Sequence, residues 1–432
     1  MPHYNYDTPT LEGGARSMQK SKDEQRTGQL QRVVQRVWER VPHYRAKMED
    51  LGLSPGDIRS LEDLSRLPFT TKNDLRDTYP YGLLACDKEE VVRIHASSGT
   101  TGKPTVVAYT RQDIATWSSL MAHRLTVAGL SSKDVFQIAL GYGLFTGALG
   151  FHWGAEELGA LVIPSGGGFT ERQVLLMEDL GTTAFTSTPS YALHLAEVLN
   201  SRKKNNLRLR LGIFGAEAWT EEMRIHLEQT LGITAIDSYG LSEIIGPGVA
   251  MECPLREGLH FDEDHFLVEI INPETGEVLP PGETGEIVIT TLTKEALPMI
   301  RYRTRDLSRL YPEPCPCGCG EKRIARILGR SDDMLIIRGV NVFPSQVEVA
   351  LGRVPGLSLH YFLEVSEKGG MKELTVCCES KTVLSEEAAG TLIRQTATEL
   401  KDLLGVRVGL RIFEPGALER SAGKAVRIKK VA

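Results

Sequence analysis

The chain has 432 residues, a length that favours two domains because single hydrophobic cores stop growing at roughly 250–300 residues. Hydrophobic residues make up 41% and charged residues 25%, a balance typical of a folded globular protein and unlike that of a disordered chain. The net charge of -6 provides no basic surface for nucleic acid or anionic lipid. Neither partner is expected, and small-molecule chemistry is favoured.

Targeting and membrane signals are weak. The segment Met1 to Gly14 is polar and lacks the apolar stretch of a secretory signal, which predicts a cytoplasmic protein. Seven cysteines, an odd number in a reducing compartment, favour metal binding or simple burial over disulfides. The uncharged stretch Val135 to Gly154 has about the length of a membrane span, but its glycines, Gln137 and His152 predict a buried strand and loop.

An amphipathic helix is predicted first, because apolar residues from Leu30 to Val41 recur at spacings of three and four and the pattern stops at Pro42. Strand-like apolar runs then alternate with helical patterns, which predicts an α/β protein with largely parallel sheets. These runs are Val91 to Ile94, Val135 to Leu140, Ala160 to Ile163, Ala184 to Ser187, Leu211 to Phe214 and Thr234 to Ile236.

The pattern changes after about residue 260. Strands Phe266 to Ile271 and Gly285 to Thr290, separated by the turn residues Asn272 to Gly276, predict an antiparallel region. A last stretch has helices and strands of its own, such as Lys372 to Cys378 and Val406 to Phe413. We place the domain boundary at Gly329-Arg330, which gives domains of residues 1–329 and 330–432.

A glycine-rich segment, Ser97 to Pro104, directly follows the first strand of this series. Its glycines let backbone N–H groups turn toward an anion, and its hydroxyls and lysine add donors and charge that suit a triphosphate. A polar hairpin or turn is the alternative. A Walker A loop is excluded, because that motif needs Gly and Ser or Thr where this chain has Ser97 and Pro104.

A second glycine pattern, Gly141-Tyr142-Gly143 with Gly147, also follows a strand and is similar to a loosened dinucleotide fingerprint. The acidic residue expected after the next strand is missing, because that strand continues into Pro164-Ser165. A nicotinamide or flavin enzyme is therefore not favoured.

Six segments in the same order resemble the motifs of the adenylate-forming superfamily. They are Ser97 to Pro104, Phe214 to Glu217, Asp237 to Glu243, Tyr302 to Asp306, Gly329 to Asp333, and Ser421 to Lys424. Within it, the chain most resembles the phenylacetate-CoA ligase family through Pro68 to Lys72, Arg93 to Ala96 and Arg338 to Gln346. Cys319 departs from that family, which more often has Arg after Cys-x-Cys-Gly.

The resemblance implies a large N-terminal domain of layered α/β subdomains with a distorted β-barrel-like region, and a small mobile α+β C-terminal domain. It also implies a reaction in two steps. An aromatic acid, phenylacetate by default, reacts with ATP to give acyl-AMP and pyrophosphate, and coenzyme A then gives the thioester and AMP. ATP, Mg²⁺ and coenzyme A are thus the expected substrates and cofactors.

Roles follow from the resemblance. Lys424 would stabilise charge at the α-phosphate, although such a lysine is otherwise a solvated tail residue. Glu243 would hold Mg²⁺ or, alternatively, cap a helix. Asp306 would bind the ribose hydroxyls, or else pair with Arg303 or Arg305. The nucleotide-binding residues expected are Ser97, Ser98, Gly99, Thr100, Thr101, Gly102, Lys103, Gly215, Ala216, Glu217, Asp237, Ser238, Tyr239, Gly240, Asp306 and Arg330.

Within that set, Tyr239 offers a flat ring to the adenine or is a core tyrosine, and Gly215 and Gly240 leave room beside a planar base. The family's C-terminal domain rotates between the two steps about a hinge at the position of Asp332. The rotation brings in the Gly339 loop to line a pantetheine tunnel, unless Gly339 is a plain turn residue.

The acid pocket is expected around Tyr142, Phe145, Gly147 and Phe214, aromatic and small residues that could equally belong to a core.

A structural zinc site is expected at Cys253, His260, Cys315 and Cys317, because Cys₃His is a closed ligand set for Zn²⁺. Cys319 is an alternative ligand, and reduced cysteines without metal are the other interpretation.

Two further functions are compatible with the sequence. One is adenylation with transfer to another thiol, such as that of a carrier protein, and the other is a catalytically silent nucleotide- or acyl-binding homologue. The Arg338 to Asn341 loop disfavours the first, and intact Lys424, Glu243 and Asp306 disfavour the second. A homodimer is left open.

Overall fold

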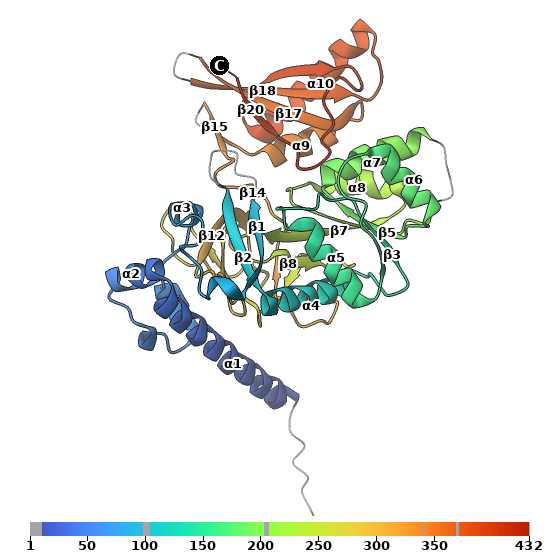
Figure 1. Cartoon of the computed structure of the whole chain (residues 1–432). Coiled ribbons are helices and arrows are strands. Elements are labelled where there is room, and N and C mark those ends of the chain that lie inside the picture. The colour runs from blue at the N-terminus through green and yellow to red at the C-terminus, as the bar shows by residue number, and fades with distance from the viewer. Residues whose placement is uncertain (1–10, 98–103, 203–206, 339, 369–370, 432) are drawn as a thin grey trace, which may run out of the picture.

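The computed structural model describes residues 11–97, 104–202, 207–338, 340–368 and 371–431. A large N-terminal part carries a smaller C-terminal part beside α7, α8 and β14 (Figure 1). Among the described residues, no helix combines the length and the hydrophobicity needed to cross a bilayer.

The chain begins with α1 (Leu11–Arg40) and α2 (Pro42–Asp50). The predicted amphipathic face is confirmed, since Leu30, Val34 and Val37 have no exposed surface. Pro42 is the first residue of α2, a position that suits its fixed φ and missing N–H. The short helices η1 (Pro55–Asp57), η2 (Leu61–Arg66), α3 (Lys72–Asp77) and η3 (Lys88–Glu90) follow.

An eight-stranded sheet with the order β13-β9-β8-β7-β6-β5-β3-β4 forms the centre of the large part. Strands β4, β3, β5, β6 and β7 are parallel, as predicted, and the other three are antiparallel. The strands are β3 (Val135–Ile138), β4 (Leu161–Ile163), β5 (Ala184–Ser187), β6 (Leu211–Gly215), β7 (Thr234–Leu241), β8 (Gly246–Glu252), β9 (Leu259–Phe261) and β13 (Arg323–Ile324). Helices α4 (Arg111–Val127), α5 (Gly147–Leu158), α6 (Thr170–Asp179), α7 (Pro189–Ser201) and α8 (Glu221–Leu231) cover it.

Two predictions for this region are wrong. The first strand, β1 (Val91–Ser97), pairs antiparallel with β2 (Thr105–Thr110) in a separate two-stranded sheet and takes no part in the parallel one. The stretch Val135 to Gly154 is not a strand and loop throughout, because α5 begins at Gly147. Its glycines permit close helix packing, since an added Cβ at Gly154 would lie 2.3 Å from Met121 Cβ on α4.

A four-stranded antiparallel sheet, β10-β11-β12-β14, confirms the predicted change of pattern. It consists of β10 (Phe266–Ile271), β11 (Gly285–Thr291), β12 (Tyr302–Ser308) and β14 (Gly329–Arg330). The predicted boundary residues therefore pair with β12, Leu307 opposite Gly329 and Asp306 opposite Arg330. The division into residues 1–329 and 330–432 stays a prediction.

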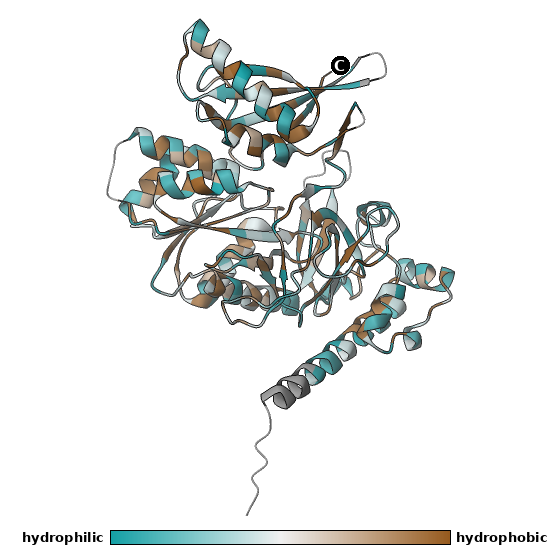
Figure 2. Ribbon diagram, turned by 180° about the vertical axis from the view of Figure 1, so that it is seen from behind, coloured by the Kyte–Doolittle hydropathy of each residue, from teal (hydrophilic) through white to brown (hydrophobic). Residues whose placement is uncertain are grey.

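The C-terminal part has an α+β fold with its own hydrophobic core. Its main sheet has the order β19-β18-β17-β20, and α10 buries Leu392, Thr396, Leu400 and Leu404 on one face of a helix of mixed hydropathy (Figure 2). The elements are β15 (Leu335–Ile337), β16 (Val340–Val342), α9 (Pro344–Gly352), β17 (Leu357–Lys368), β18 (Met371–Ser380), α10 (Glu386–Leu404), β19 (Gly409–Phe413) and β20 (Ile428–Lys430).

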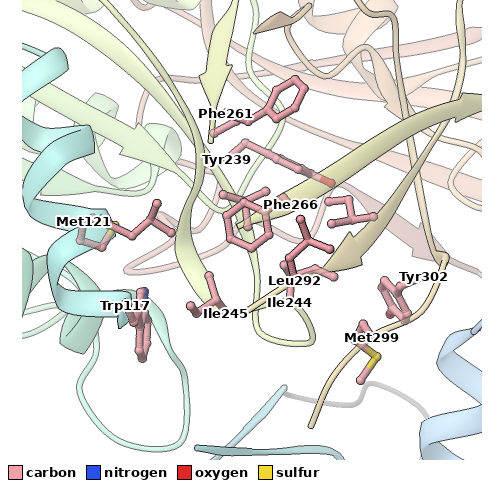
Figure 3. Packing of buried hydrophobic residues seen from close by; sticks show 14 of the residues in the cluster. Trp117, Met121, Tyr239, Ile244, Ile245, Phe261, Phe266, Leu292, Met299 and Tyr302 are labelled. Carbon is pink, nitrogen blue, oxygen red and sulfur yellow. The ribbon is translucent and has the colours of Figure 1, made fainter. Parts of the chain in front are cut away.

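The main core joins the central sheet to the antiparallel one. Tyr239 and Phe261, from β7 and β9, belong to the same buried cluster as Phe266, Leu292 and Tyr302 (Figure 3). Burial of each such side chain stabilises the fold by roughly 1.5–3 kcal/mol. This core fixes β7 relative to β12, the two strands that carry the polar groups described next.

Candidate active site

Asp306 lies at the centre of a polar cluster formed by three strands. The Tyr239 hydroxyl on β7 donates a 2.7 Å hydrogen bond to Asp306 Oδ2, and Arg330 Nη1 on β14 donates to Oδ1 at 3.2 Å. Burial raises the pKa of Asp306 to about 6, against the opposing effects of Arg330, Tyr239 and the Lys424 ammonium. Lys424 therefore acts on this carboxyl from the C-terminal part of the chain.

The predicted alternative partners of Asp306 are engaged elsewhere. Arg303 Nη2 lies 2.6 Å from Glu286 Oε2, and Arg305 Nη1 lies 3.5 Å from the same oxygen. The alternative prediction, an ion pair of Asp306 with Arg303 or Arg305, is therefore wrong. Arg330 takes that place, and its Nε and Nη2 also donate to Asp332 at 2.8 and 3.0 Å.

The residues expected to face the adenine lie on adjoining strands, with Gly215 of β6 opposite Ser238 of β7. An added Cβ at Gly215 would lie 2.2 Å from Ser238 O, and one at Gly240 would lie 2.1 Å from Gly246 O. The close approach of the neighbouring strands therefore requires glycine at both positions. We had expected a different reason, namely space for a planar base. Ala216 follows with φ of +69°, a left-handed conformation that costs free energy in a non-glycine residue.

Asp237 is also tied to the protein. Its side chain accepts from Arg326 Nε at 3.3 Å, and its backbone N–H donates to Glu252 Oε2 at 2.8 Å. By contrast, the buried Ser238 hydroxyl has no hydrogen-bond partner among the described residues.

Glu243 lies in the turn between β7 and β8, where it is 5% exposed. No helix of the described chain begins there, so the alternative role as a helix cap is wrong. Lys72 Nζ, at the start of α3, lies 3.6 Å from Glu243 Oε1. Lys72 belongs to a segment that resembles the family, but nothing in the local sequence pattern indicates that it meets Glu243.

A second lysine near Glu243 was not predicted. The buried Lys294 donates to the Glu243 backbone carbonyl at 3.2 Å and lies over the Tyr109 ring, 4.9 Å from its centroid. Burial lowers the pKa of Lys294 to about 8, while the negative charges of Asp113 and Glu243 act in the opposite direction.

Lys424 is exposed, but the residues on both sides of it are fixed to the large part of the chain. The Thr188 hydroxyl donates to Gly423 O at 3.0 Å, and the backbone N–H of Ala425 donates to Glu217 Oε1. The interpretation of Lys424 as a solvated tail residue does not fit this docked loop.

The expected acid-binding residues divide into two groups. Tyr142 and Phe145, 38% and 42% exposed, lie in the loop between β3 and α5, and Gly147 begins α5. The Tyr142 hydroxyl lies 3.0 Å from His152 Nδ1, and His152 Nε2 lies 3.1 Å from Glu156 Oε1. Burial raises the pKa of Tyr142.

Phe214 is different, because it has no exposed surface and its ring contacts those of Phe185 and Trp219 at centroid distances of 5.3 and 5.7 Å. In this arrangement Phe214 belongs to the core, which corrects its assignment to the acid pocket.

Part of the expected site lies outside the described residues, namely Ser98, Gly99, Thr100, Thr101, Gly102 and Lys103 of the glycine-rich segment, together with Gly339. Ser97 is the last residue of β1, and its buried hydroxyl has no partner within the described parts of the chain.

The four residues expected to bind zinc lie together: one ligand atom from each of Cys253, His260, Cys315 and Cys317 is within 4.8 Å of the others. Cys253 Sγ lies 3.9 Å from Cys315 Sγ, and Cys317 Sγ lies 3.7 Å from His260 Nε2. Tetrahedral bonds of typical Zn–S and Zn–N length would give separations of about 3.8 and 3.6 Å. Burial lowers the pKa of His260 to about 4, which keeps the imidazole neutral and able to ligate.

Cys319 lies on the other side of the same imidazole, with Sγ 3.1 Å from His260 Nδ1. It forms a second group with His260 and Glu321, and this group shares His260 with the first.

Two family models match this chain: AMP-binding enzyme over residues 39–293 and the AMP-binding enzyme C-terminal domain over residues 339–430. The class is therefore that of adenylate-forming enzymes. The phenylacetate-coenzyme A ligase of Escherichia coli (strain K12) is 50% identical over 94% of this chain and 95% of its own length. The chain belongs to the phenylacetate-CoA ligase family and is an AMP-forming acid–thiol ligase.

Solved structures of 2-hydroxyisobutyryl-CoA ligase are similar too. The postadenylation state with 2-HIB-AMP has a TM-score of 0.89 at 28% identity, covering 95% of this chain and 90% of that one. With 2-HIB-AMP and CoA in the thioesterification state, the TM-score is 0.71 at 30% identity and the same coverage. The arrangement of the present chain thus matches the first of these two states better.

Proposed function

We propose that this ligase converts an aromatic carboxylic acid, phenylacetate by default, into its coenzyme A thioester. The observation that carries the proposal is the docking of the Lys424 loop beside the cluster of Tyr239, Asp306 and Arg330, so that one ammonium acts on the carboxyl expected to bind ribose. High identity to phenylacetate-CoA ligases supports the choice of acid.

In the first step, a carboxylate oxygen of the acid attacks the α-phosphorus of ATP, and pyrophosphate leaves. Both reactants are anions, so catalysis depends on positioning and on positive charge. Asp306 accepts hydrogen bonds from the ribose hydroxyls, and Lys424 stabilises the negative charge that develops around the α-phosphate. Tyr239 and the β6 end at Gly215 and Ala216 flank the adenine.

Glu243 would hold Mg²⁺, which neutralises phosphate charge when bound. The chemistry of the site fits a hard cation, because the carboxylate of a buried glutamate already attracts one cation, Lys72. Lys72 itself adds positive charge on the side where the phosphates of ATP are expected.

In the second step, the thiol of coenzyme A attacks the carbonyl carbon of the acyl-adenylate, AMP leaves, and the thiol proton is released. We expect the C-terminal domain to rotate about Asp332, which withdraws Lys424 and brings the Gly339 loop to the pantetheine. The pairing of Asp332 with Arg330 would have to open for that rotation. The two TM-scores against one relative in two states support such an alternation.

Zinc at Cys253, His260, Cys315 and Cys317 would have a structural role. It would fasten the loop after Tyr311 to the end of β8 and to β9, and its four protein ligands leave no open position for a substrate.

Acid-dependent exchange of labelled pyrophosphate into ATP, followed by thioester detection, tests the proposal. The acids to compare are phenylacetate, hydroxyphenylacetate, indoleacetate, benzoate and anthranilate, and exchange followed by thioester with an aryl acid is expected. Exchange without a CoA product would favour a carrier-protein acceptor, and no exchange with any acid would favour a silent homologue. A cytoplasmic location and a homodimer stay predictions for cell fractionation and size-exclusion chromatography.

A further inference from the structure

We propose that Glu217 and Thr188 are positioning residues that hold the backbone on the two sides of Lys424 while the adenylate forms. The inference rests on the proposed function of Lys424. It gives Glu217 a role different from the adenine wall expected from the sequence.

Thr188 provides the first attachment. It caps the N-terminus of α7, where its side chain accepts from Tyr191 N at 3.3 Å. The same hydroxyl donates to Gly423 O at 3.0 Å. One side chain thus fixes the start of a buried helix of the large part and the peptide that directly precedes Lys424.

Glu217 provides the second attachment. Its Oε1 accepts from the backbone N–H of Ala425, directly after Lys424, while its Oε2 accepts from the Ser190 hydroxyl at 2.6 Å and the Ser190 backbone N–H at 3.3 Å. Ser190 therefore orients the carboxylate before the C-terminal loop arrives. A hydrogen bond to an ionised acceptor is stronger than one between neutral groups, so this is the stronger of the two attachments.

The local backbone explains how Glu217 reaches this position. Ala216 has φ of +69°, which turns the chain sharply after β6 and directs the next residue toward the start of α7. The strained conformation of Ala216 is thereby linked to the position of Glu217.

Other contacts between the two parts of the chain hold the C-terminal part as a whole against the large part. Arg420 Nε lies 3.2 Å from Glu197 Oε2, His360 Nε2 lies 2.9 Å from Glu197 Oε1, and Glu348 Oε1 accepts from Thr220 N at 3.1 Å. None of these three contacts involves a neighbour of Lys424. Thr188 and Glu217 bond to both peptides that flank it, which sets where the ammonium can reach.

A long lysine side chain has many rotamers, so its reach is useful only when its Cα is fixed. The attachments at Thr188 and Glu217 form only when the C-terminal part is docked as it is here. They should therefore assist the adenylation step and be absent during thioester formation.

The test separates the two half-reactions in the full-length protein. Glu217→Ala should lower the rate of acid-dependent pyrophosphate exchange about tenfold or more, with the KM for ATP unchanged, because a bond to a charged acceptor is typically of that strength. Thioester formation from supplied aryl-adenylate and CoA should stay within about twofold of the wild-type rate. Glu217→Gln keeps an amide oxygen that accepts from Ala425, but its NH2 group can no longer accept from Ser190, so it should recover only part of the exchange rate.

Thr188→Val should give a smaller loss, and Thr188→Ser should restore it. Glu274→Ala, in the exposed β10–β11 turn, is the control for loss of a glutamate, and Ser385→Ala, which removes the cap of α10, is the control for loss of a helix cap.

Equal loss of both half-reactions in Glu217→Ala, or a raised KM for ATP with an unchanged maximal rate, would overturn the inference and favour adenine binding. If the wild-type protein catalyses pyrophosphate exchange and Glu217→Ala does so at the same rate, only this inference would be overturned. Absence of exchange in the wild type itself would overturn the proposed function.

Discussion

Lys72 of α3 and Glu243 of the β7–β8 turn face one another, with 3.6 Å between Nζ and Oε1. The lysine side chain is 40% exposed and the glutamate side chain only 7%, so the pair lies at the edge of the interior. Lys72 thus approaches the carboxylate that we propose for the metal ion.

The first prediction concerns Lys72. Lys72→Met keeps the length of the side chain and removes its charge, and it should raise the KM for ATP in pyrophosphate exchange about tenfold. Thioester formation from supplied adenylate should change little, since the adenylate lacks the β- and γ-phosphates. Lys133→Met, at an exposed turn before β3, is the control. Equal effects on both half-reactions would contradict a role with these phosphates.

The second prediction concerns Lys424. Lys424→Ala should lower the rate of adenylation by about a hundredfold or more, as expected for the loss of a group that stabilises transition-state charge. Thioesterification of supplied aryl-adenylate should be nearly unaffected. Stopped-time assays of each half-reaction measure the difference, and a comparable loss in both would count against a rotating domain.

The third prediction uses the pKa of Asp306, which burial raises from 3.8 to about 6. In the role that we propose, the ionised form accepts hydrogen bonds from the ribose hydroxyls, so affinity for ATP should fall as the pH decreases through about 6. Titration calorimetry between pH 8 and pH 5 with a non-hydrolysable ATP analogue measures this. Asp306→Asn should bind the analogue weakly at every pH. The terminal phosphate of the analogue also titrates in this range, so a pH dependence as steep as that of the wild type is the result that would refute the assignment.

The same shift has a consequence for stability. A raised pKa in the folded state means that the folded protein holds this proton more tightly than the unfolded one. The favourable contribution is complete below pH 3.8 and disappears as the pH rises through about 6, beyond which burial of the charge opposes folding. Asp306→Asn should therefore not lower the melting temperature at pH 8, although it weakens nucleotide binding.

The fourth prediction concerns the cysteine cluster. Purified protein should contain about one zinc ion per chain, and Cys315→Ser should lose it together with at least about 5 °C in melting temperature. Cys86→Ser, outside the cluster, is the control. Cys319→Ser should retain zinc because its sulfur contacts Nδ1 of His260, whereas Cys317 contacts Nε2. Full zinc content in Cys315→Ser, measured by inductively coupled plasma mass spectrometry, would contradict the site.

Much of the fold could be predicted because parallel strands at the centre of a sheet are short and buried on both faces, as β5 and most of β6 are. The antiparallel pairing of β1 could not, since an apolar run does not specify its partner. Helix α5 was missed because glycine disfavours helices in general, and only its packing against Met121 and Trp117 of α4 explains Gly150 and Gly154.

In the candidate site, too, some residues could be predicted from the sequence and others could not. Motif residues such as Tyr239 and Asp306 were found by resemblance, and their 2.7 Å hydrogen bond confirms that they meet. Lys72 and Thr188 gave no local signal, because each acquires its partner only through folding: Glu243 is 171 positions from Lys72 in sequence, and Gly423 is 235 positions from Thr188. Phe214 was misassigned because an aromatic residue at a strand end suits a pocket and a core equally well.

If the loop before α5 binds the acid, as we propose, the contact between α4 and α5 also limits how the choice of acid can change. Added Cβ atoms at Gly150 and Gly154 would lie 2.6 Å from Trp117 Cζ2 and 2.3 Å from Met121 Cβ, so the two helices cannot move apart through small substitutions without losing their packing. The loop that contains Tyr142 and Phe145 therefore leads directly into a helix whose position is fixed. We expect new acid preferences to evolve by exchange of side chains on that loop, while the helices beneath it stay unchanged.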